Sequence, residues 1–407
     1  MKPLIYLYQD QLQEFLNTKT ETVGAAYEWK GEGVYHAYFD YPKVSPTGFP
    51  SLCLFSLGKE SIETVINSFL NSNMGNKKPN YIIGIQFTVD CGVVSKRGIV
   101  FDGVEFTEAE VKYVPTKSEL YTRSKGLLEV DALEKKRVLI VGLGSGGSNI
   151  AVELAKAGIG NFSLVDFDRI ELHNIARHIC GVNELGRLKT NAVKDAILLK
   201  NPYAKIKTYN FDMNDHLDII EREILEADLT IAATDELKSR FNLNDLIVKH
   251  GKTGLFGRAV TRAEGGDVLR VRPGGPCYAC LKGGSWYNHA DEISDIKRAR
   301  ETGIIRPYTS EEDAQAMVQV GLSTDIAPIN TMMVKLALLE LSRGTECEII
   351  SLDAELTYDY YMWANRRDNH YQNWAPFNSP EKKLPTILRW IGVKLSKDTE
   401  CMVCNNG

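Results

Sequence analysis

The residues of this chain with the clearest chemical potential are three glycines that follow a short apolar segment. The segment reads Val-Leu-Ile-Val, and Gly142, Gly144 and Gly147 follow it in the spacing GxGxxG. Glycines at this spacing let the backbone turn sharply and approach a phosphate, while the N-terminus of the next helix faces the anion. A second apolar segment ends at Asp166, where a carboxylate could bind ribose hydroxyls. These features predict a nucleotide site, and they fit a redox dinucleotide as well as ATP.

A group of polar residues after Asp166 distinguishes between these two nucleotides. The group comprises Asp168, Asn174, Arg177 and Lys189. A dehydrogenase needs one acid for the ribose and a site for hydride transfer, and it has no need for this cluster. A triphosphate does need it, because Arg and Lys neutralise phosphate oxygens while acids hold ribose and metal. We therefore favour ATP over NAD(P).

A further acid, Asp235, follows another apolar segment. Ligands of open α/β sheets bind beyond the carboxyl ends of the strands, so Asp235 is placed to hold Mg²⁺ against the phosphates. Plainer interpretations exist for the other residues taken singly. Asn174 could cap a helix, and Arg177 and Lys189 could be surface charges. Asp168 could equally serve only the fold.

The elements that must position these residues alternate between apolar strands and amphipathic helices. We expect strands at 138–141, 162–165, 206–210 and 229–232, and helices at 146–157, 189–199 and 216–226. Such alternation predicts a parallel sheet with crossover helices, which is a Rossmann-like, doubly wound, mostly parallel α/β fold. We expect hairpin-like strands and one apolar helix to follow, with strands at 266–271, 348–353 and 355–361 and the helix at 329–341.

The length of 407 residues predicts two domains. We expect a small N-terminal α/β domain of unassigned role at 1–115, a connector at 116–136 and the nucleotide-binding domain at 137–407. The polar segment 282–325 is expected to cross over the site. In the first domain, His36 and Asp40 lack the further ligands of a metalloprotease, so we interpret His36 as structural.

Four of the eight cysteines form two CxxC pairs, Cys277 with Cys280 and Cys401 with Cys404. In a reducing compartment such pairs suggest metal rather than disulfides, and a structural Zn²⁺ takes four thiolates. The 120 residues between the pairs leave four unliganded thiols as the alternative.

Bulk properties bound the remaining function classes. The net charge of −5 and the pI near 5.9 argue against a protein that binds nucleic acid or a membrane surface. No apolar run approaches the ~18 residues of a membrane span. The N-terminal apolar stretch is too short for a secretory signal, so we expect a cytoplasmic protein.

Together the motifs resemble the ThiF/MoeB family of adenylyltransferases, whose fold the ubiquitin-activating enzymes share. The resemblance covers about residues 120–345 and the terminal CxxC pair. The matching features are the glycine loop, Asp166-Phe-Asp168, Asn174-Ile-Ala-Arg177, the turn 186–189, Thr234-Asp235, the segment 274–280 and Ala327-Pro328.

The resemblance assigns roles to these residues. It implies Asp166 for the ribose, Asn174, Arg177 and Lys189 for the phosphates, and Asp235 for Mg²⁺. It also implies a zinc site that pins the C-terminal tail to the adenylation domain. Arg123, in Tyr-Thr-Arg-Ser, matches an arginine that enters the ATP site of the neighbouring subunit, which implies a homodimer.

The implied reaction is adenylation of the C-terminal glycine carboxylate of a ubiquitin-like protein. The carboxylate attacks the α-phosphate of ATP and pyrophosphate leaves. Both reactants are anions, so preorganised Arg, Lys and Mg²⁺ would lower the barrier, and no general base is needed. The substrate could instead be a sulfur-carrier protein, a ribosomal peptide or a tRNA-linked carboxylate. An NAD(P)-dependent oxidoreductase and a non-catalytic scaffold remain as alternatives from other classes.

The sequence departs from the ubiquitin-activating pattern in one important respect. Relatives that pass the acyl group to a thiol, before a downstream conjugating enzyme acts, often carry that cysteine on the crossover segment. No cysteine occurs between residues 281 and 346. Cys180 follows Arg177 and His178, which could favour its thiolate, but we interpret it as structural. The thioester step therefore stays open.

Overall fold

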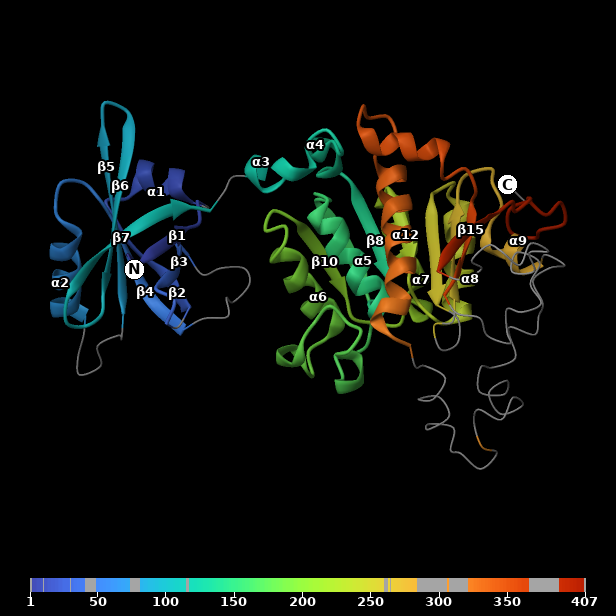
Figure 1. Ribbon diagram of the computed structural model, residues 1–407, viewed down its shortest axis with the longest axis horizontal. Coiled ribbons are helices and arrows are strands. Elements are labelled where there is room, and N and C mark those ends of the chain that lie inside the picture. Colours follow the sequence, from blue (N-terminus) through green and yellow to red (C-terminus); the bar gives the residue numbers. More distant parts are fainter. Residues whose placement is uncertain are drawn as a thin grey trace. The chain divides into compact units, whose positions relative to one another are not determined.

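The computed structural model of the chain describes residues 2–9, 11–29, 31–40, 49–73, 81–114, 117–259, 263, 265–283, 306, 321–365 and 388–405. Most of the crossover segment expected at 282–325 lies outside these ranges. The chain divides into two compact units, Met1–Thr122 and Arg123–Gly407 (Figure 1). Within the described ranges, no helix combines the length and the apolar character that crossing a bilayer requires.

The first unit is a closed barrel of seven strands in the order β1-β3-β2-β4-β5-β6-β7. The strands are β1 (Leu4–Leu7), β2 (Glu21–Trp29), β3 (Val34–Tyr38), β4 (Phe49–Leu57), β5 (Ile82–Asp90), β6 (Val93–Phe101) and β7 (Phe106–Tyr113). The barrel closes because β1 pairs in parallel with both β3 and β7. The expected small α/β unit thus takes the form of a barrel with two helices.

The two barrel helices pack on different surfaces. Helix α1 (Leu12–Thr18) contributes Leu12 and Phe15 to the apolar cluster that fills the barrel. Helix α2 (Ile62–Asn73) packs from outside against β4 and β5. His36 is half-buried, and its Nδ1 atom lies 3.0 Å from the hydroxyl of Tyr8. Burial lowers the pKa of His36.

The second unit contains an eight-stranded sheet in the order β10-β9-β8-β11-β12-β13-β14-β15. The strands are β8 (Arg137–Val141), β9 (Asn161–Val165), β10 (Lys205–Tyr209), β11 (Leu229–Ala232), β12 (Gly254–Ala259), β13 (Gly265–Val271), β14 (Tyr360–Ala364) and β15 (Arg389–Val393). Pairing is parallel from β10 to β12 and antiparallel from β12 to β15. The sheet is therefore mostly parallel, with an antiparallel extension.

Helices cover both faces of this sheet, which makes the fold doubly wound (Figure 1). One layer contains α5 (Ser145–Lys156), α6 (Lys189–Leu198) and α12 (Ser323–Leu341), and the other contains α7 (Leu217–Glu226), α8 (Leu237–Lys249) and α9 (Tyr278–Gly283). The central strands β8 and β11 are buried along almost their whole length, as their uninterrupted apolar runs predict.

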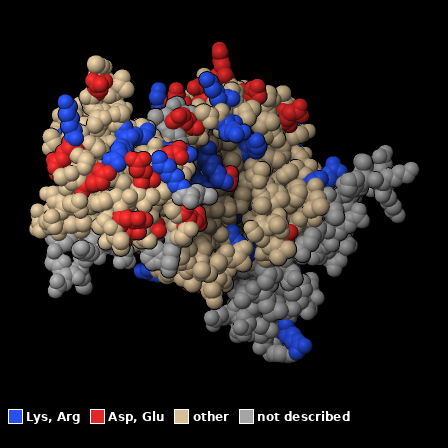
Figure 2. All heavy atoms as spheres, turned by 60° about the vertical axis from the view of Figure 1, so that its left-hand side comes forward, with Lys and Arg blue, Asp and Glu red and all other residues tan. Residues whose placement is uncertain are grey.

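Basic and acidic side chains are interspersed on the face of the molecule shown in Figure 2.

The expectations for the end of the chain were partly wrong. The strand expected at 348–353 is a 3₁₀ helix, η7 (Glu348–Ala354), and the strand expected at 355–361 begins only at Tyr360. The late start of this strand has a physical reason in Arg270 on β13, which donates hydrogen bonds to the carbonyl oxygens of Leu356 and Tyr358, both at 3.0 Å. These carbonyls are directed to a guanidinium and not to a neighbouring strand.

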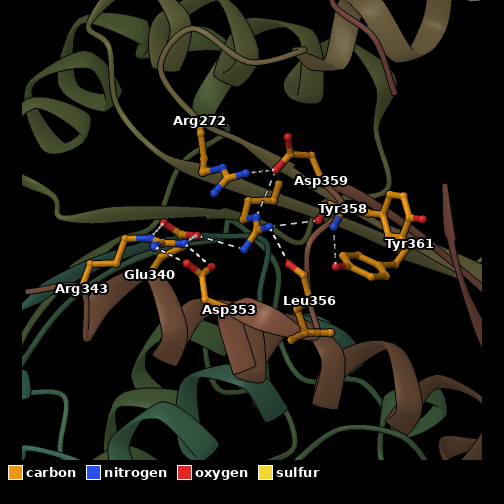
Figure 3. Close-up of polar contacts among 9 residues, drawn as sticks. Arg272, Glu340, Arg343, Asp353, Leu356, Tyr358, Asp359 and Tyr361 are labelled. Carbon is orange, nitrogen blue, oxygen red and sulfur yellow. Dashed lines mark hydrogen bonds and ion pairs between the residues drawn. The ribbon is translucent and has the colours of Figure 1, made fainter. Parts of the chain in front are cut away.

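Arg270 is the centre of a buried ionic network that joins β13, α12 and the segment before β14 (Figure 3). Its side chain is fully buried, and it contacts Glu340 at 3.0 Å and Asp359 at 3.2 Å. Arg272 donates to Asp359 at 2.8 Å, and Arg343 bridges Glu340 and the more exposed Asp353. The network thus compensates a buried cation with two carboxylates and two backbone carbonyls.

Candidate nucleotide and metal sites

Two of the three glycines close the junction between β8, α5 and β11. Gly142 has a φ of +87°, and a Cβ atom there would lie 2.8 Å from the backbone of Ala233. A Cβ at Gly147 would clash with the carbonyl oxygen of Gly142. A Cβ at Gly144 would meet nothing, because this residue borders open space. Gly147 therefore serves packing, whereas Gly144 leaves room for a ligand.

Asp166 anchors this loop from the end of β9. Its carboxylate accepts hydrogen bonds from the backbone N–H of Leu143 at 2.6 Å and of Asp168 at 2.8 Å. Burial raises the pKa of Asp166, and the nearby Lys189 ammonium together with these backbone donors opposes that rise. The carboxylate is thus fixed in place beside the glycine loop, where a ribose would lie.

Lys189 begins α6 and is almost buried, with 10% of its side chain exposed. Its ammonium lies 2.6 Å from Asp168 and 4.0 Å from Asp166. The half-exposed Asp168 is therefore an ion-pair partner of the cation that was expected to contact phosphate. Acids and cation thus stand together at one end of the parallel sheet.

Asn174 and His178 both stabilise the loop between β9 and α6. The amide oxygen of Asn174 accepts from the N–H of Glu171 at 3.0 Å, so the helix-capping interpretation holds for that atom. The Nδ1 atom of His178 accepts from the N–H of Cys180 at 3.1 Å, so Nε2 carries the proton and donates to the carbonyl of Leu143 at 2.8 Å. Burial lowers the pKa of His178, which favours this neutral form.

These groups line one cavity of about 870 Å³, a volume typical of small-molecule sites. The structure brings together eight of the residues that the sequence assigned to ATP: Gly142, Gly144, Asp166, Asp168, Asn174, Arg177, Lys189 and Asp235. Arg123 does not join them, since it lies exposed in η1 (Thr122–Ser124). The sequence reasoning missed His178, Arg240 and Arg258, which also line the cavity. Only His178, next to Arg177, could have been suspected from its place in a motif.

The two CxxC pairs meet in a second, buried site. All four sulfur atoms lie within 4.8 Å of one another, although 120 residues separate the pairs. The Sγ–Sγ distances include 3.8 Å for Cys277–Cys280, 3.7 Å for Cys277–Cys401 and 3.3 Å for Cys280–Cys404. Zn–S bonds of about 2.3 Å in a tetrahedron require sulfur atoms about 3.8 Å apart. The backbone N–H of Asp398 also points to the sulfur of Cys280, at 3.4 Å. The cluster therefore fits a structural zinc ion.

A metal measurement tests this fit. We expect about one zinc per chain, and we expect its loss when Cys401 and Cys404 are both replaced by serine, because two thiolates hold zinc weakly. Atomic absorption on purified protein gives the zinc content, and a melting curve with and without a chelator gives its contribution to stability. Cys91→Ser is the matched control, because Cys91 is exposed and distant in sequence from the cluster. Folded wild-type protein that is free of metal would contradict the assignment.

The other cysteines show no catalytic placement. All eight cysteines fall within the described ranges, and none of them lines the cavity. Cys180 is the nearest along the chain to the cavity residues, but it is buried, and burial raises the pKa of its thiol to about 12. A thiol with such a pKa is a poor nucleophile at neutral pH.

Comparisons with known proteins agree with this geometry. The sequence matches the ThiF family over residues 119–360, which is more than half of the chain. The chain belongs to the ThiF family. It is 30% identical over 223 residues to the molybdopterin-synthase adenylyltransferase of Escherichia coli K12, covering 54% of this chain and 88% of that protein.

Other relatives share only part of their length with this ThiF family member. Identity to the adenylyltransferase and sulfurtransferase UBA4 of Lodderomyces elongisporus is 33% over 179 residues, covering 43% of this chain and 37% of that protein. The chain thus spans little more than a third of that relative. Among solved structures, E. coli MccB with succinimide matches with a TM-score of 0.50 at 18% identity, covering 72% of this chain and 75% of the other. This likeness supports the Rossmann-like fold.

Proposed function

We propose that the protein adenylates the C-terminal carboxylate of a ubiquitin-like or sulfur-carrier protein at the expense of ATP. The observation that carries the proposal is that one cavity gathers a glycine loop, the carboxylate of Asp166 and several cations. The names of the relatives support the same activity, since they are adenylyltransferases. One of them, from Caenorhabditis elegans, is named a ubiquitin-like modifier-activating enzyme and is 27% identical over 163 residues.

The residues of the cavity would divide the work as follows. Asp166 binds the ribose, and the glycine loop lets the phosphates approach the N-terminus of α5. Lys189 and Arg177 face the phosphates, and they offset the repulsion between the triphosphate and the incoming carboxylate. Asp235, at the end of β11, would hold Mg²⁺, which supplies further positive charge at the phosphates.

Other parts of the proposal concern the assembly. We propose a cytoplasmic homodimer in which Arg123 reaches the ATP site of the second subunit. A zinc ion at the four cysteines would fasten the tail, residues 388–405, to α9 and so to the sheet. A downstream conjugating enzyme or sulfur-transfer enzyme would then consume the activated carrier.

The cysteine placement favours the acyl-adenylate, and not a thioester on this chain, as the product that leaves the site. We expect Cys180→Ala to keep full adenylation activity, because Cys180 is buried and does not line the cavity. We also expect no covalent carrier–enzyme adduct that dithiothreitol releases on a denaturing gel. An adduct that dithiothreitol cleaves by thiol exchange, and that disappears in Cys180→Ala, would contradict this assignment.

ATP–pyrophosphate exchange tests the proposed function. Exchange that depends on an added ubiquitin-like protein with a C-terminal glycine supports it, and the same protein with a C-terminal amide serves as the inactive control. Exchange with another carboxylate would change the substrate but keep the chemistry. Binding of NAD without binding of ATP would point to an oxidoreductase and overturn the proposal.

A further inference from the structure

Among the described residues of the second unit, two arginines are buried, and only one of these two has acidic partners. Arg270 is 0% exposed and pairs with Glu340 and Asp359. Arg240, on α8, is 4% exposed. Its hydrogen bonds go to two backbone carbonyls, from Nε to Thr234 at 2.8 Å and from Nη2 to Gly257 at 3.1 Å. Among the residues that the structure describes, no carboxylate lies at ion-pair distance from Arg240.

This difference is physically significant because a guanidinium stays charged at any pH that a protein tolerates. A buried charge without an opposite charge is costly, so natural proteins pair it or present it to a ligand. Arg240 lines the 870 Å³ cavity, where a ligand could reach it. The neighbouring Glu236 is engaged elsewhere, since its carboxylate accepts hydrogen bonds from Asn214 at 2.7 Å and from Ser239 at 2.5 Å. An anion in the cavity would therefore complete the environment of Arg240.

The strand order indicates which anion this is. Lys189 and Asp166 stand at the end of β9, whereas the carbonyl partners of Arg240 follow β11 and lie on β12. Strand β8 and its glycine loop lie between these two sides. A nucleotide with its ribose at Asp166 occupies the β9 side and the loop. Arg240, with its carbonyl partners after β11 and on β12, faces the side of the cavity beyond Asp235, which the ribose and the glycine loop leave open to a second reactant.

We propose that Arg240 binds the terminal carboxylate of the protein substrate and holds it for attack on ATP. This inference rests on the proposed function. In the reaction one carboxylate oxygen forms a bond to the α-phosphorus, and the bond from that phosphorus to the β-phosphate oxygen breaks. Pyrophosphate leaves with the electron pair. Arg240 donates to the carboxylate before attack, when the carboxylate still carries its full charge, so its loss should act mainly on substrate binding.

The test compares Arg240→Gln, Arg240→Lys and the wild type, all as zinc-loaded full chains. The probes are a non-hydrolysable ATP analogue with Mg²⁺ and a short synthetic peptide ending in Gly-Gly, prepared both as the free carboxylate and as the C-terminal amide. We expect the wild type with bound nucleotide analogue to bind the carboxylate form about 10- to 100-fold more tightly than the amide, as a charge-assisted hydrogen bond predicts. Arg240→Gln should lose this preference and keep its affinity for the analogue, and Arg240→Lys should keep part of the preference.

Arg270→Gln is the matched control, because it also alters a buried arginine. It should lower the melting temperature and leave the carboxylate preference intact. The proposal is overturned if Arg240→Gln keeps the preference, or if the wild type shows none. It is also overturned if Arg240→Gln weakens binding of the analogue as much as Lys189→Ala does, since Arg240 would then be a phosphate ligand. If Arg240→Gln does not fold, Arg240→Lys decides by the same two affinities.

The two proposals can fail separately. If the wild type prefers the carboxylate peptide but catalyses no pyrophosphate exchange with any carrier, the Arg240 proposal stands and the adenylation proposal is refuted. If the wild type catalyses exchange and Arg240→Gln leaves the KM for the carrier unchanged, the adenylation proposal stands and the Arg240 proposal is refuted.

Discussion

Replacement of Lys189 by alanine should lower the rate of ATP–pyrophosphate exchange by about 100- to 1,000-fold, the usual cost of removing one preorganised electrostatic group. The ammonium of Lys189 is nearly buried and is held by Asp168 and Asp166, so it has little freedom to adopt another position. No other residue of the α6 N-terminus can supply the charge. Exchange measured at saturating ATP and carrier concentrations shows the effect on the chemical step.

The same substitution should change the pH dependence of nucleotide binding. Burial already raises the pKa of Asp166, and Lys189 opposes this rise. Without the ammonium the pKa of Asp166 should rise further, so the ionised carboxylate, which is proposed to accept hydrogen bonds from the ribose hydroxyls, is lost at a higher pH. Affinity for an ATP analogue should therefore decline in the variant as pH falls, and this decline should begin at a higher pH than in the wild type. Lys249→Ala, which removes an exposed lysine paired with Glu221, should change neither property. Equal exchange rates in Lys189→Ala and Lys249→Ala would refute the phosphate role of Lys189.

Replacement of Arg270 by leucine should have the largest effect on stability, about 3–5 kcal/mol of unfolding free energy. The substitution removes the fully buried cation that Glu340, whose side chain is 6% exposed, and Asp359, which is 18% exposed, have in common. Each carboxylate keeps one more exposed partner, Arg343 for Glu340 and Arg272 for Asp359. The substitution also removes the donors to Leu356 and Tyr358, so the turn that leads into β14 loses its fixed geometry. Urea denaturation monitored by tryptophan fluorescence gives the free energy.

Two further variants separate burial from mere ion pairing. Arg343→Ala removes a partly exposed arginine from the same network, and we expect a loss of about 1 kcal/mol or less. The double variant Arg270→Leu with Glu340→Leu should recover part of the loss, because it removes one of the two carboxylates that lack the buried guanidinium. If Arg270→Leu and Arg343→Ala destabilise the protein equally, burial of the network is not what makes it important.

The sequence predicted the parallel half of the sheet well, for a physical reason. Strands such as β8 and β11 are uninterrupted apolar runs because both of their faces are covered, and α5 carries its apolar residues at helical spacing. The antiparallel half was harder to predict. Strand β12 contains Gly254 and Gly257, which weaken a strand pattern. The structure shows what these glycines accommodate, since the side chains of Met333 and Ile247 occupy the space that a Cβ at Gly257 and at Gly254 would take.

The candidate-site residues that belong to a sequence motif were predictable. Those that reach the site through contacts with residues far away in the sequence were not. Asp166, Lys189 and Asp235 stand just beyond strands or at a helix start, so their convergence follows from the parallel topology. Arg240 lies inside α8 with nothing in its neighbours to single it out, and its burial depends on contacts with the backbone after β11 and on β12. Barrel closure in the first unit was hidden for the same reason, because it depends on pairing between strands far apart in the sequence.

The four-cysteine cluster also has a consequence for the behaviour of the protein when zinc is absent. Among the strands that the structure describes, β15 lies at the edge of the sheet and pairs with β14 alone. Eight residues after it the chain reaches Cys401. If zinc is withheld, the four cysteines no longer hold the end of the chain in place, and β15 can dissociate from β14. Strand β14 would then become the exposed edge strand of the sheet, and its five residues are all buried in the intact fold. An apolar strand with unpaired backbone groups promotes self-association. The first effect of zinc removal should therefore be aggregation of molecules that are otherwise still folded.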